Sequence, residues 1–194
     1  MRKIKDKRYC QLPKVSTVSG RSSSITNAFF NAIIPVHAPT PEDELEALAV
    51  LEMTPEEICC AYCGNPHTEW DHLRPIIRGK EPTGYITEIA NLVPACGKCN
   101  QSKGGYYWKD WMLGSAQRSP KTRGIENLDR KVMILERYES WREPIHINVE
   151  RVIGPELWKK HIENWREVLD LLGKSQTLAK QIRKLIEDAT KRSA

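Results

Sequence analysis

The chain has 194 residues, 40% of them hydrophobic, so it is long enough to bury a core as one elaborated domain or two small ones. No window approaches the roughly 18 apolar residues of a membrane-spanning helix, and the opening MRKIKDKR leads into polar sequence rather than an apolar signal core. We therefore expect a soluble, cytoplasmic protein with no membrane partner.

The net charge of +5 is unevenly distributed along the chain. Residues 42–57 hold seven acidic side chains and no basic one, whereas residues 98–123 hold six basic side chains against Asp110 alone. A second basic group opens the chain and consists of Arg2, Lys3, Lys5, Lys7 and Arg8. Such asymmetry favours a polyanionic partner, with a merely solvated surface as the alternative. Within the basic stretch we predict nucleic-acid contacts for Lys98, Lys103 and Lys109.

The first half of the chain contains several secondary-structure signals. The Ser-rich and Thr-rich residues 11–26 predict an irregular arm, and residues 27–34 suit either a short helix or a strand. Thr40, followed by proline and acidic residues, is typical of a helix start, and this helix should run to about Leu51 with three leucines (Leu45, Leu48 and Leu51) on one side. The same signal at residues 54–57 predicts a second, short helix.

The second half of the chain is expected to be helical. Residues 106–113 carry aromatic side chains at near-helical spacing, which indicates core packing rather than a stacking platform for bases. Apolar residues from Ile125 to Leu135 mark another helix. Two further apolar runs, 158–172 and 178–189, are separated by Gly173, which we expect to end the first helix and so form a hairpin.

The cysteines point to a metal site. Cys60 and Cys63 form one C-x2-C pair, and Cys96 and Cys99 form another. Four thiolates are the usual ligand set of a tetrahedral structural zinc ion, which has no open position for chemistry. The two remaining cysteines, Cys10 and Cys59, are expected to be ordinary thiols. Cys59 is an alternative to Cys60 as the first member of the first pair, because it lies one helical turn before Cys63.

Candidate catalytic residues lie between and just after these pairs. Asp71 and His72 fall in a predicted short strand that Pro75 ends, and Asn100 directly follows Cys99. A histidine is suited to accept a proton from water at neutral pH, and carboxylate and amide oxygens are suited to bind Mg²⁺. Taken alone, an Asp-His pair is more often structural. His37, His146 and His161 are assigned to structure or surface, and for His67 a structural role is favoured over a ligand or base role.

The whole pattern resembles the HNH endonucleases of the ββα-metal superfamily in their zinc-stabilised form. The resemblance covers about residues 57–112 and is carried by C60-x2-C63, D71-H72-L-R-P75 and N91-L-V-P-A-C96-x2-C99-N100-x2-K103-G104. It implies two antiparallel strands followed by a helix, with a catalytic metal ion at their junction. It also implies that His72 activates water, that Asp71 and Asn100 bind one Mg²⁺ or Mn²⁺ ion, and that Asn91 braces the loop and orients the base through a hydrogen bond. Lys103, expected at the start of the following helix, is suited to contact a phosphate.

The chain departs from this family in its loop after Pro75, where RGKEPTGYITEI replaces a shorter turn. Its last motif residue is asparagine rather than the histidine of some branches, which favours Mg²⁺ over transition metals. We therefore expect an α+β, mainly helical fold with a small ββα-metal core. Three regions are predicted: a basic arm and helix at 1–56, the nuclease core at 57–115 and a helical region at 116–194.

The expected function is metal-dependent hydrolysis of phosphodiester bonds in double-stranded DNA, which the resemblance implies leaves 5′-phosphate and 3′-hydroxyl ends. A type II restriction-like or other prokaryotic or phage defence nuclease is expected, acting as a homodimer through its C-terminal helices so that both strands are cut. Two alternatives stay open: a non-catalytic zinc-binding adaptor of nucleic acids, and the nuclease subunit of a larger defence complex activated by a partner protein.

Overall fold

The computed structural model describes residues 13–192, so the basic group at the start of the chain and Cys10 lie outside the described residues. The chain forms two compact units, one of residues 26–161 and one whose described parts are 13–25 and 162–192. Within the described range, no helix combines the length and the apolar character needed to cross a membrane. The three-region division at residues 56 and 115 stays a prediction.

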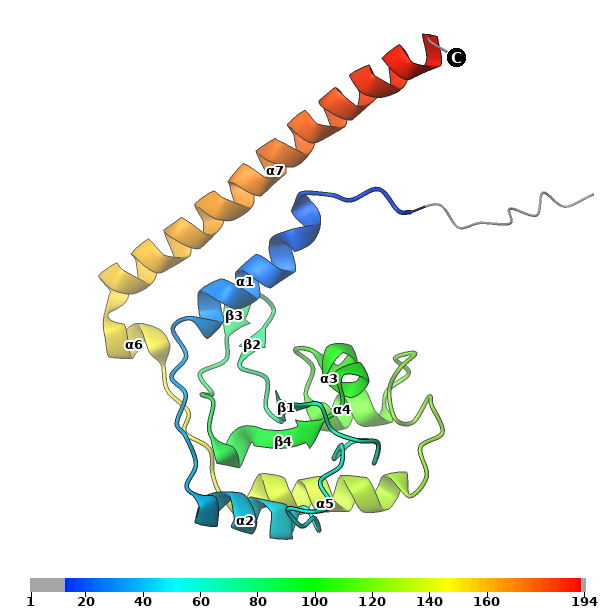
Figure 1. Cartoon of the computed structure of the whole chain (residues 1–194). Helices are drawn as coiled ribbons and strands as arrows, with labels where there is room; N and C mark the ends of the chain where they lie inside the picture. The colour runs from blue at the N-terminus through cyan, green and yellow to red at the C-terminus, as the bar shows by residue number, and fades with distance from the viewer. Residues whose placement is uncertain (1–12, 193–194) are drawn as a thin grey trace, which may run out of the picture. The chain divides into compact units, whose positions relative to one another are not determined.

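The centre of the larger unit is a pair of antiparallel strands followed by a helix (Figure 1). Strand β1 (Glu69–His72) pairs with β4 (Leu92–Ala95), so that Asp71 lies opposite Val93 and His72 opposite Leu92. Helix α3 (Gly97–Lys103) begins directly after Cys96, its N-cap residue. The predicted α+β, mainly helical fold with a small ββα core is confirmed.

Helices pack around this core. Helix α2 (Pro41–Val50) and helix α5 (Leu128–Trp141) contact each other and the 3-10 turn η2 (Ile89–Asn91), while α4 (Trp108–Leu113) contacts α3. The hydrophobic core contains side chains from all of these elements, including Trp108, Trp111, Met112, Val132 and Leu135. The aromatic run before Gly114 therefore belongs to the core, as predicted.

The remaining elements precede, interrupt or follow this core along the chain. They are η1 (Ser19–Arg21), α1 (Ser22–Asn31), the hairpin of β2 (Ile77–Arg78) with β3 (Glu81–Pro82), and α6 (Val149–Ile153). The hairpin turns through Gly79 and Lys80, which both have positive φ, so the long loop after Pro75 is a folded insertion. Helix α7 (Pro155–Arg192) is 38 residues long.

Two predictions about helices near the N-terminus were wrong. Residues 19–26 of the expected arm are helical, because α1 starts at Ser22 and continues through the 27–31 segment whose type was left open. Residues 54–57 form a tight turn in which Glu57 N donates to Thr54 O (3.0 Å) rather than starting a helix. The chain has to bend here because the backbone of Cys59, only two residues later, forms an antiparallel β-bridge with Pro66 and leads into the cysteine pair.

The helix at residues 41–50 was predicted correctly, including its start. The Thr40 hydroxyl accepts from Asp43 N (3.1 Å), and the Asp43 carboxylate accepts from Thr40 N (3.2 Å), which completes a capping box. Of the three leucines, Leu48 and Leu51 are buried and Leu45 is exposed.

The predicted break at Gly173 was wrong, because α7 runs through it without interruption. A single glycine inside a helix costs only about 1 kcal/mol relative to alanine. The Lys174–Asp170 ion pair (2.5 Å) spans the position, and the Thr177 hydroxyl donates to Gly173 O (3.2 Å). These local contacts and the continuing apolar periodicity outweigh the weak stop signal.

The buried hydroxyl of Tyr138 connects α5 to the ββα core, since it hydrogen-bonds Ile89 O and Leu92 O (2.7 Å for the latter). In Tyr138→Phe both carbonyls lose this donor, so we expect the free energy of unfolding to fall by about 1–3 kcal/mol. Urea denaturation followed by circular dichroism measures the change. Tyr106→Phe is the matched control, since Tyr106 is exposed; an equal loss in both variants would contradict this role of Tyr138.

Candidate active site and zinc centre

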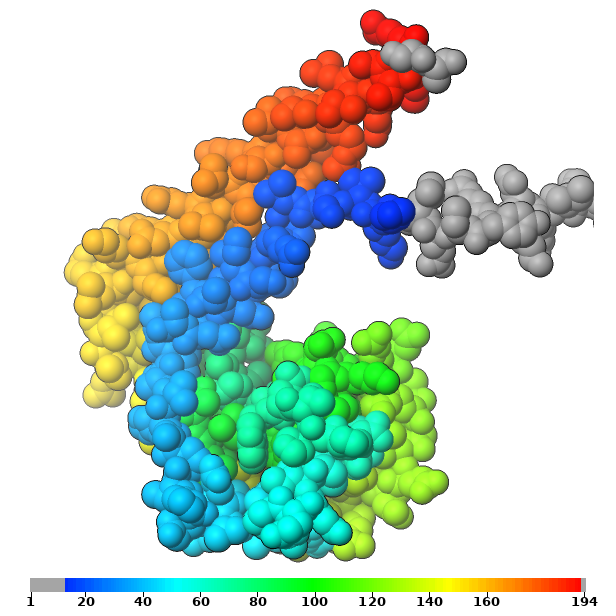
Figure 2. Space-filling model, viewed as in Figure 1, coloured from blue at the N-terminus to red at the C-terminus, as the bar shows by residue number. Residues whose placement is uncertain are grey.

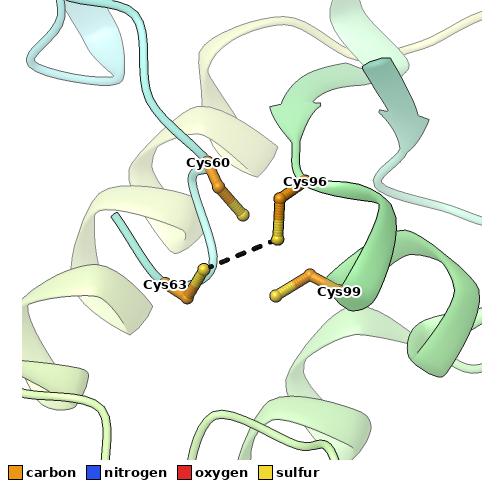
Figure 3. Close-up of side chains that lie close together, drawn as sticks. All are labelled: Cys60, Cys63, Cys96 and Cys99. Atoms are coloured by element: carbon orange, nitrogen blue, oxygen red, sulfur yellow. Dashed lines mark hydrogen bonds between the residues drawn. The ribbon is translucent and has the colours of Figure 1, made fainter. Parts of the chain in front are cut away.

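Four cysteine side chains converge at one end of the strand pair (Figure 3). Cys60 and Cys63 come from the turn before β1, whereas Cys96 caps α3 and Cys99 lies in its first turn. The four sulfur atoms lie within 4.8 Å of one another, and Cys63 Sγ is 3.7 Å from Cys96 Sγ. A tetrahedral ion with Zn–S bonds of about 2.3 Å requires sulfur separations of about 3.8 Å. The donor set and its spacing therefore fit a structural zinc ion.

The backbone explains why the cysteines meet. Gly64, with φ of 77°, closes the first turn by donating to Cys60 O (2.8 Å), and Ala61 N donates to Pro94 O (2.8 Å), which fastens this turn to β4. Cys59 lies outside the cluster, so Cys60 is the first member of the pair. Arg123 donates to Cys99 Sγ (3.2 Å) and brings a positive charge next to the thiolates, which lowers the cost of their negative charge.

The same cluster positions Asn100. Its backbone N–H donates to Cys96 O (3.1 Å), so the asparagine is the next residue of a helix that the cysteines anchor to the strands. Trp111 Nε1 donates to Ser102 Oγ (3.0 Å) and ties α3 to α4. The helix that carries Asn100 is thus held at both ends.

Asp71, His72, Asn100 and Lys103 line one groove of about 340 Å³. At about 30 Å³ per water molecule, this groove has room for a metal ion, a phosphate group and several waters. The strand pairing places Asp71 and His72 at one side, and α3 supplies the other two residues. The structure therefore brings together three of the four predicted catalytic residues and one predicted phosphate ligand.

Asp71 is buried and has two polar partners. Tyr62 donates to its Oδ2 at 2.7 Å, and Lys103 Nζ lies 3.3 Å from the same oxygen. Burial raises the pKa of Asp71, and the attraction of Lys103 opposes this shift; burial also lowers the pKa of Lys103, opposed by Asp71. Burial and the Asp71 charge raise the pKa of Tyr62 well above its usual range, so its hydroxyl stays a donor. Within residues 13–192 all these bonds use Oδ2, and Oδ1 remains available to a cation.

Lys103 lies elsewhere than expected. It is the last residue of α3 rather than the first residue of the following helix, and its side chain is only 1% exposed. The glycines after it allow the chain to turn, and Lys103 Nζ also donates to Gly104 O (3.2 Å). The ammonium therefore compensates the buried charge of Asp71, and its contact with phosphate stays a prediction.

The His72 ring is neutral at neutral pH, because burial and the nearby Lys103 ammonium lower the pKa of His72 to about 4. A neutral imidazole has a lone pair with which to accept a proton. The ring nitrogen Nε2 lies 2.8 Å from Thr87 Oγ1. The hydrogen-bond partner of this ring nitrogen is thus Thr87, whereas Asn91 was expected to orient the ring.

Asn91 is fully buried and braces the loop after β1. Its Oδ1 accepts from Arg74 N (2.8 Å), and its Nδ2 donates to Arg74 O (3.0 Å) and Ile86 O (3.3 Å). The expected bracing is present in the structure. The correction concerns only the target of its hydrogen bonds, which is backbone on both sides of the insertion rather than the His72 ring.

The other predicted residues lie away from the groove. Lys98 is exposed on α3, and Lys109 of α4 pairs with Glu136 of α5. His67 Nδ1 lies 3.1 Å from Ile58 O, which indicates a structural role. Tyr62, Thr87 and Arg123 were missed, since Tyr62 is only a spacer residue of the first cysteine pair in the motif, and the positions of Thr87 and Arg123 carry no metal-binding or catalytic signal.

Loss of one ligand is expected to release the zinc ion. Cys99→Ser should lower the metal content from about one zinc per chain to near zero and destabilise the protein, because serine is a poor zinc ligand. Atomic emission on the purified protein measures this. Cys59→Ser is the matched control, since Cys59 is outside the cluster. Zinc loss in the control, or full retention in Cys99→Ser, would contradict the assignment.

Comparisons with known proteins agree with this geometry. Searches of curated proteins and of solved structures gave no match. The family model described as HNH endonuclease matches residues 60–105, a range that begins at the first clustered cysteine and ends just after Lys103. Residues 60–105 of this chain are therefore similar to the HNH endonuclease family.

Proposed function

We propose that this chain is a metal-dependent endonuclease that hydrolyses phosphodiester bonds in double-stranded DNA. The observation that carries the proposal is the shared groove, in which the neutral base His72 lies together with the oxygen-bearing side chains Asp71 and Asn100. A base beside two oxygen donors suits hydrolysis of a phosphate ester.

The donor set fits a hard divalent cation. Asp71 and Asn100 offer a carboxylate and an amide oxygen, which match Mg²⁺ or Mn²⁺, and neither residue belongs to the cysteine cluster. When bound, such an ion supplies positive charge that stabilises the phosphorane and the departing oxygen. Asp71 and Asn100 would hold this ion, and His72 would take a proton from the attacking water. Tyr62 and Lys103 keep the Asp71 carboxylate in place through its other oxygen.

Two alternative functions predict different behaviour. A non-catalytic zinc-binding adaptor needs no base next to oxygen ligands, so the composition of the groove favours the enzyme. A nuclease subunit of a larger defence complex would cut only with its partner protein. The restriction-like or other defence role and the cytoplasmic location belong to this proposal and rest on the family resemblance and the absence of a membrane-spanning helix in residues 13–192.

A homodimer would supply two active sites for cutting both strands. Support comes from α7, where Leu171, Leu178 and Leu185 are exposed at seven-residue spacing, with Ile182 between them. The C-terminal part of this helix, coloured orange to red, presents much of its surface in Figure 2. Such a stripe is typical of helices that pair with another helix.

Catalysis is tested with supercoiled plasmid DNA and Mg²⁺ or Mn²⁺. We expect wild type to cut, His72→Ala to lose about 10²–10⁴-fold in rate because no base remains, and Asn100→Ala to lose cutting while it keeps zinc. His37→Ala is the matched control, since His37 is an exposed histidine of the same unit. Gel electrophoresis measures the rates, and atomic emission the zinc.

Three results would contradict this assignment. Undiminished cutting by His72→Ala would remove the base role, and undiminished cutting by Asn100→Ala would remove the ligand role. Tight DNA binding without any cutting by wild type would favour the adaptor, unless addition of host extract restores cutting, which would favour the complex subunit.

The dimer is tested by sedimentation of the full chain. We expect the Leu178→Glu and Leu185→Glu double variant to sediment as a monomer, because charges on the exposed stripe oppose apolar pairing. Lys180→Glu is the control on a different face of α7 and should stay dimeric. A monomeric wild type at micromolar concentration would exclude the proposed dimer.

A further inference from the structure

Thr87 is the one described hydrogen-bond partner of the His72 ring among residues 13–192. The contact joins Nε2 to Thr87 Oγ1 at 2.8 Å, and no described hydrogen bond involves Nδ1 in that range. Thr87 lies in the insertion between β3 and η2, four residues before Asn91. Neither the motif nor its spacing singled out this residue.

The backbone of Thr87 is held on both sides by a segment from another part of the chain. Thr87 N donates to Pro35 O (3.2 Å), and Thr87 O accepts from His37 N (2.8 Å). Residues 35–37 connect α1 to α2 and precede the matched HNH region. Because the N–H and the carbonyl of Thr87 are both hydrogen-bonded to residues 35–37, the backbone that carries its side chain next to His72 is held in place.

The direction of the hydrogen bond decides whether His72 acts as a base. A neutral imidazole carries one N–H and one lone pair, on different nitrogens. If Nε2–H donates to the Thr87 oxygen, the lone pair is on Nδ1 and is available to water. If the threonine donates instead, Nδ1 carries the proton and the ring has no free lone pair. Only the first arrangement leaves a base in the groove.

We propose that Thr87 is a positioning residue that accepts a hydrogen bond from Nε2–H of His72 and thereby fixes the tautomer in which Nδ1 takes the proton. This inference rests on the proposed nuclease function, although the tautomer can be measured without any cutting of DNA. In the reaction, water gives one proton to Nδ1 and its oxygen bonds to phosphorus. The phosphorus–oxygen bond to the leaving group breaks, its electron pair stays on the departing oxygen, and that oxygen takes a proton from solvent.

The tautomer is measured directly by nitrogen-15 NMR of the histidine ring in the full-length, zinc-loaded protein. We expect the Nε2–H form in wild type and in Thr87→Ser, which keeps the hydroxyl. Thr87→Val has nearly the same shape but no acceptor, so its His72 signals should shift toward a mixture of both tautomers. Thr83→Val is the matched control: the Thr83 hydroxyl donates to Pro75 O (2.6 Å) in the same insertion and does not contact His72.

Plasmid cleavage provides the second measurement. Thr87→Val should lower kcat at least about tenfold with little change in KM, within the roughly 10²–10⁴-fold that a general base contributes. Thr87→Ser should keep most of the rate. In a His72→Ala background Thr87→Val should cause no further loss, because a residue that acts through His72 has nothing left to position.

The outcomes separate this inference from the proposed function. An Nδ1–H ring in wild type, an unchanged tautomer in Thr87→Val, or an equal loss of rate with and without His72 would overturn the role of Thr87. Tautomer changes as expected in a chain that never cuts DNA would support the Thr87–His72 hydrogen bond and count against the nuclease function.

Discussion

The convergence of four cysteine sulfurs is the constraint on which the functional region depends. Two strands of four residues and a helix of seven have little apolar surface of their own, and these elements come from segments 33 residues apart between Cys63 and Cys96. A zinc ion shared by the four sulfurs would turn the chain between the two pairs into a closed loop with fixed ends. Because Asn100 follows the last cysteine within the same helix, the constraint that holds the fold also places a catalytic candidate. The zinc-binding cysteine and the candidate Mg²⁺ ligand thus lie in the same helix, α3.

A second constraint is the burial of charge. Asp71 lies in the interior and would be costly there alone, but Lys103 and Tyr62 converge on one of its oxygens. This arrangement leaves the second oxygen for another cation and keeps the carboxylate from rotating. It also explains the neutral His72, whose ring is partly buried and near the Lys103 ammonium. The acidic, basic and neutral groups of the groove therefore depend on one another, and a change at one alters the others.

Local signals predicted elements well where no long-range contact competed with them. The helix at 41–50 was predicted from Thr40 and the residues after it, since a capping box is satisfied within one turn. The same signal at Thr54 did not start a helix, because the nearby cysteine pair requires a bend. Gly173 did not end a helix, because contacts on either side of it maintain α7. Tyr62 and Thr87 were beyond reach, since each acts on a residue 9 or 15 positions away and only the folded chain brings them into contact.

By itself the sequence determined the residue types and their order: two cysteine pairs, an Asp-His pair between them and an asparagine after the last cysteine. The ligand chemistry follows from the donor atoms and their spacing, whereas the ββα core was expected from the family resemblance that these residues carry. Only the tertiary structure decided that Lys103 neutralises Asp71 instead of facing outward, and that Thr87, held by residues 35–37, contacts the His72 ring. The physical reason is that burial and hydrogen-bond partners depend on segments meeting in space, and neither is encoded in the local pattern of any one segment.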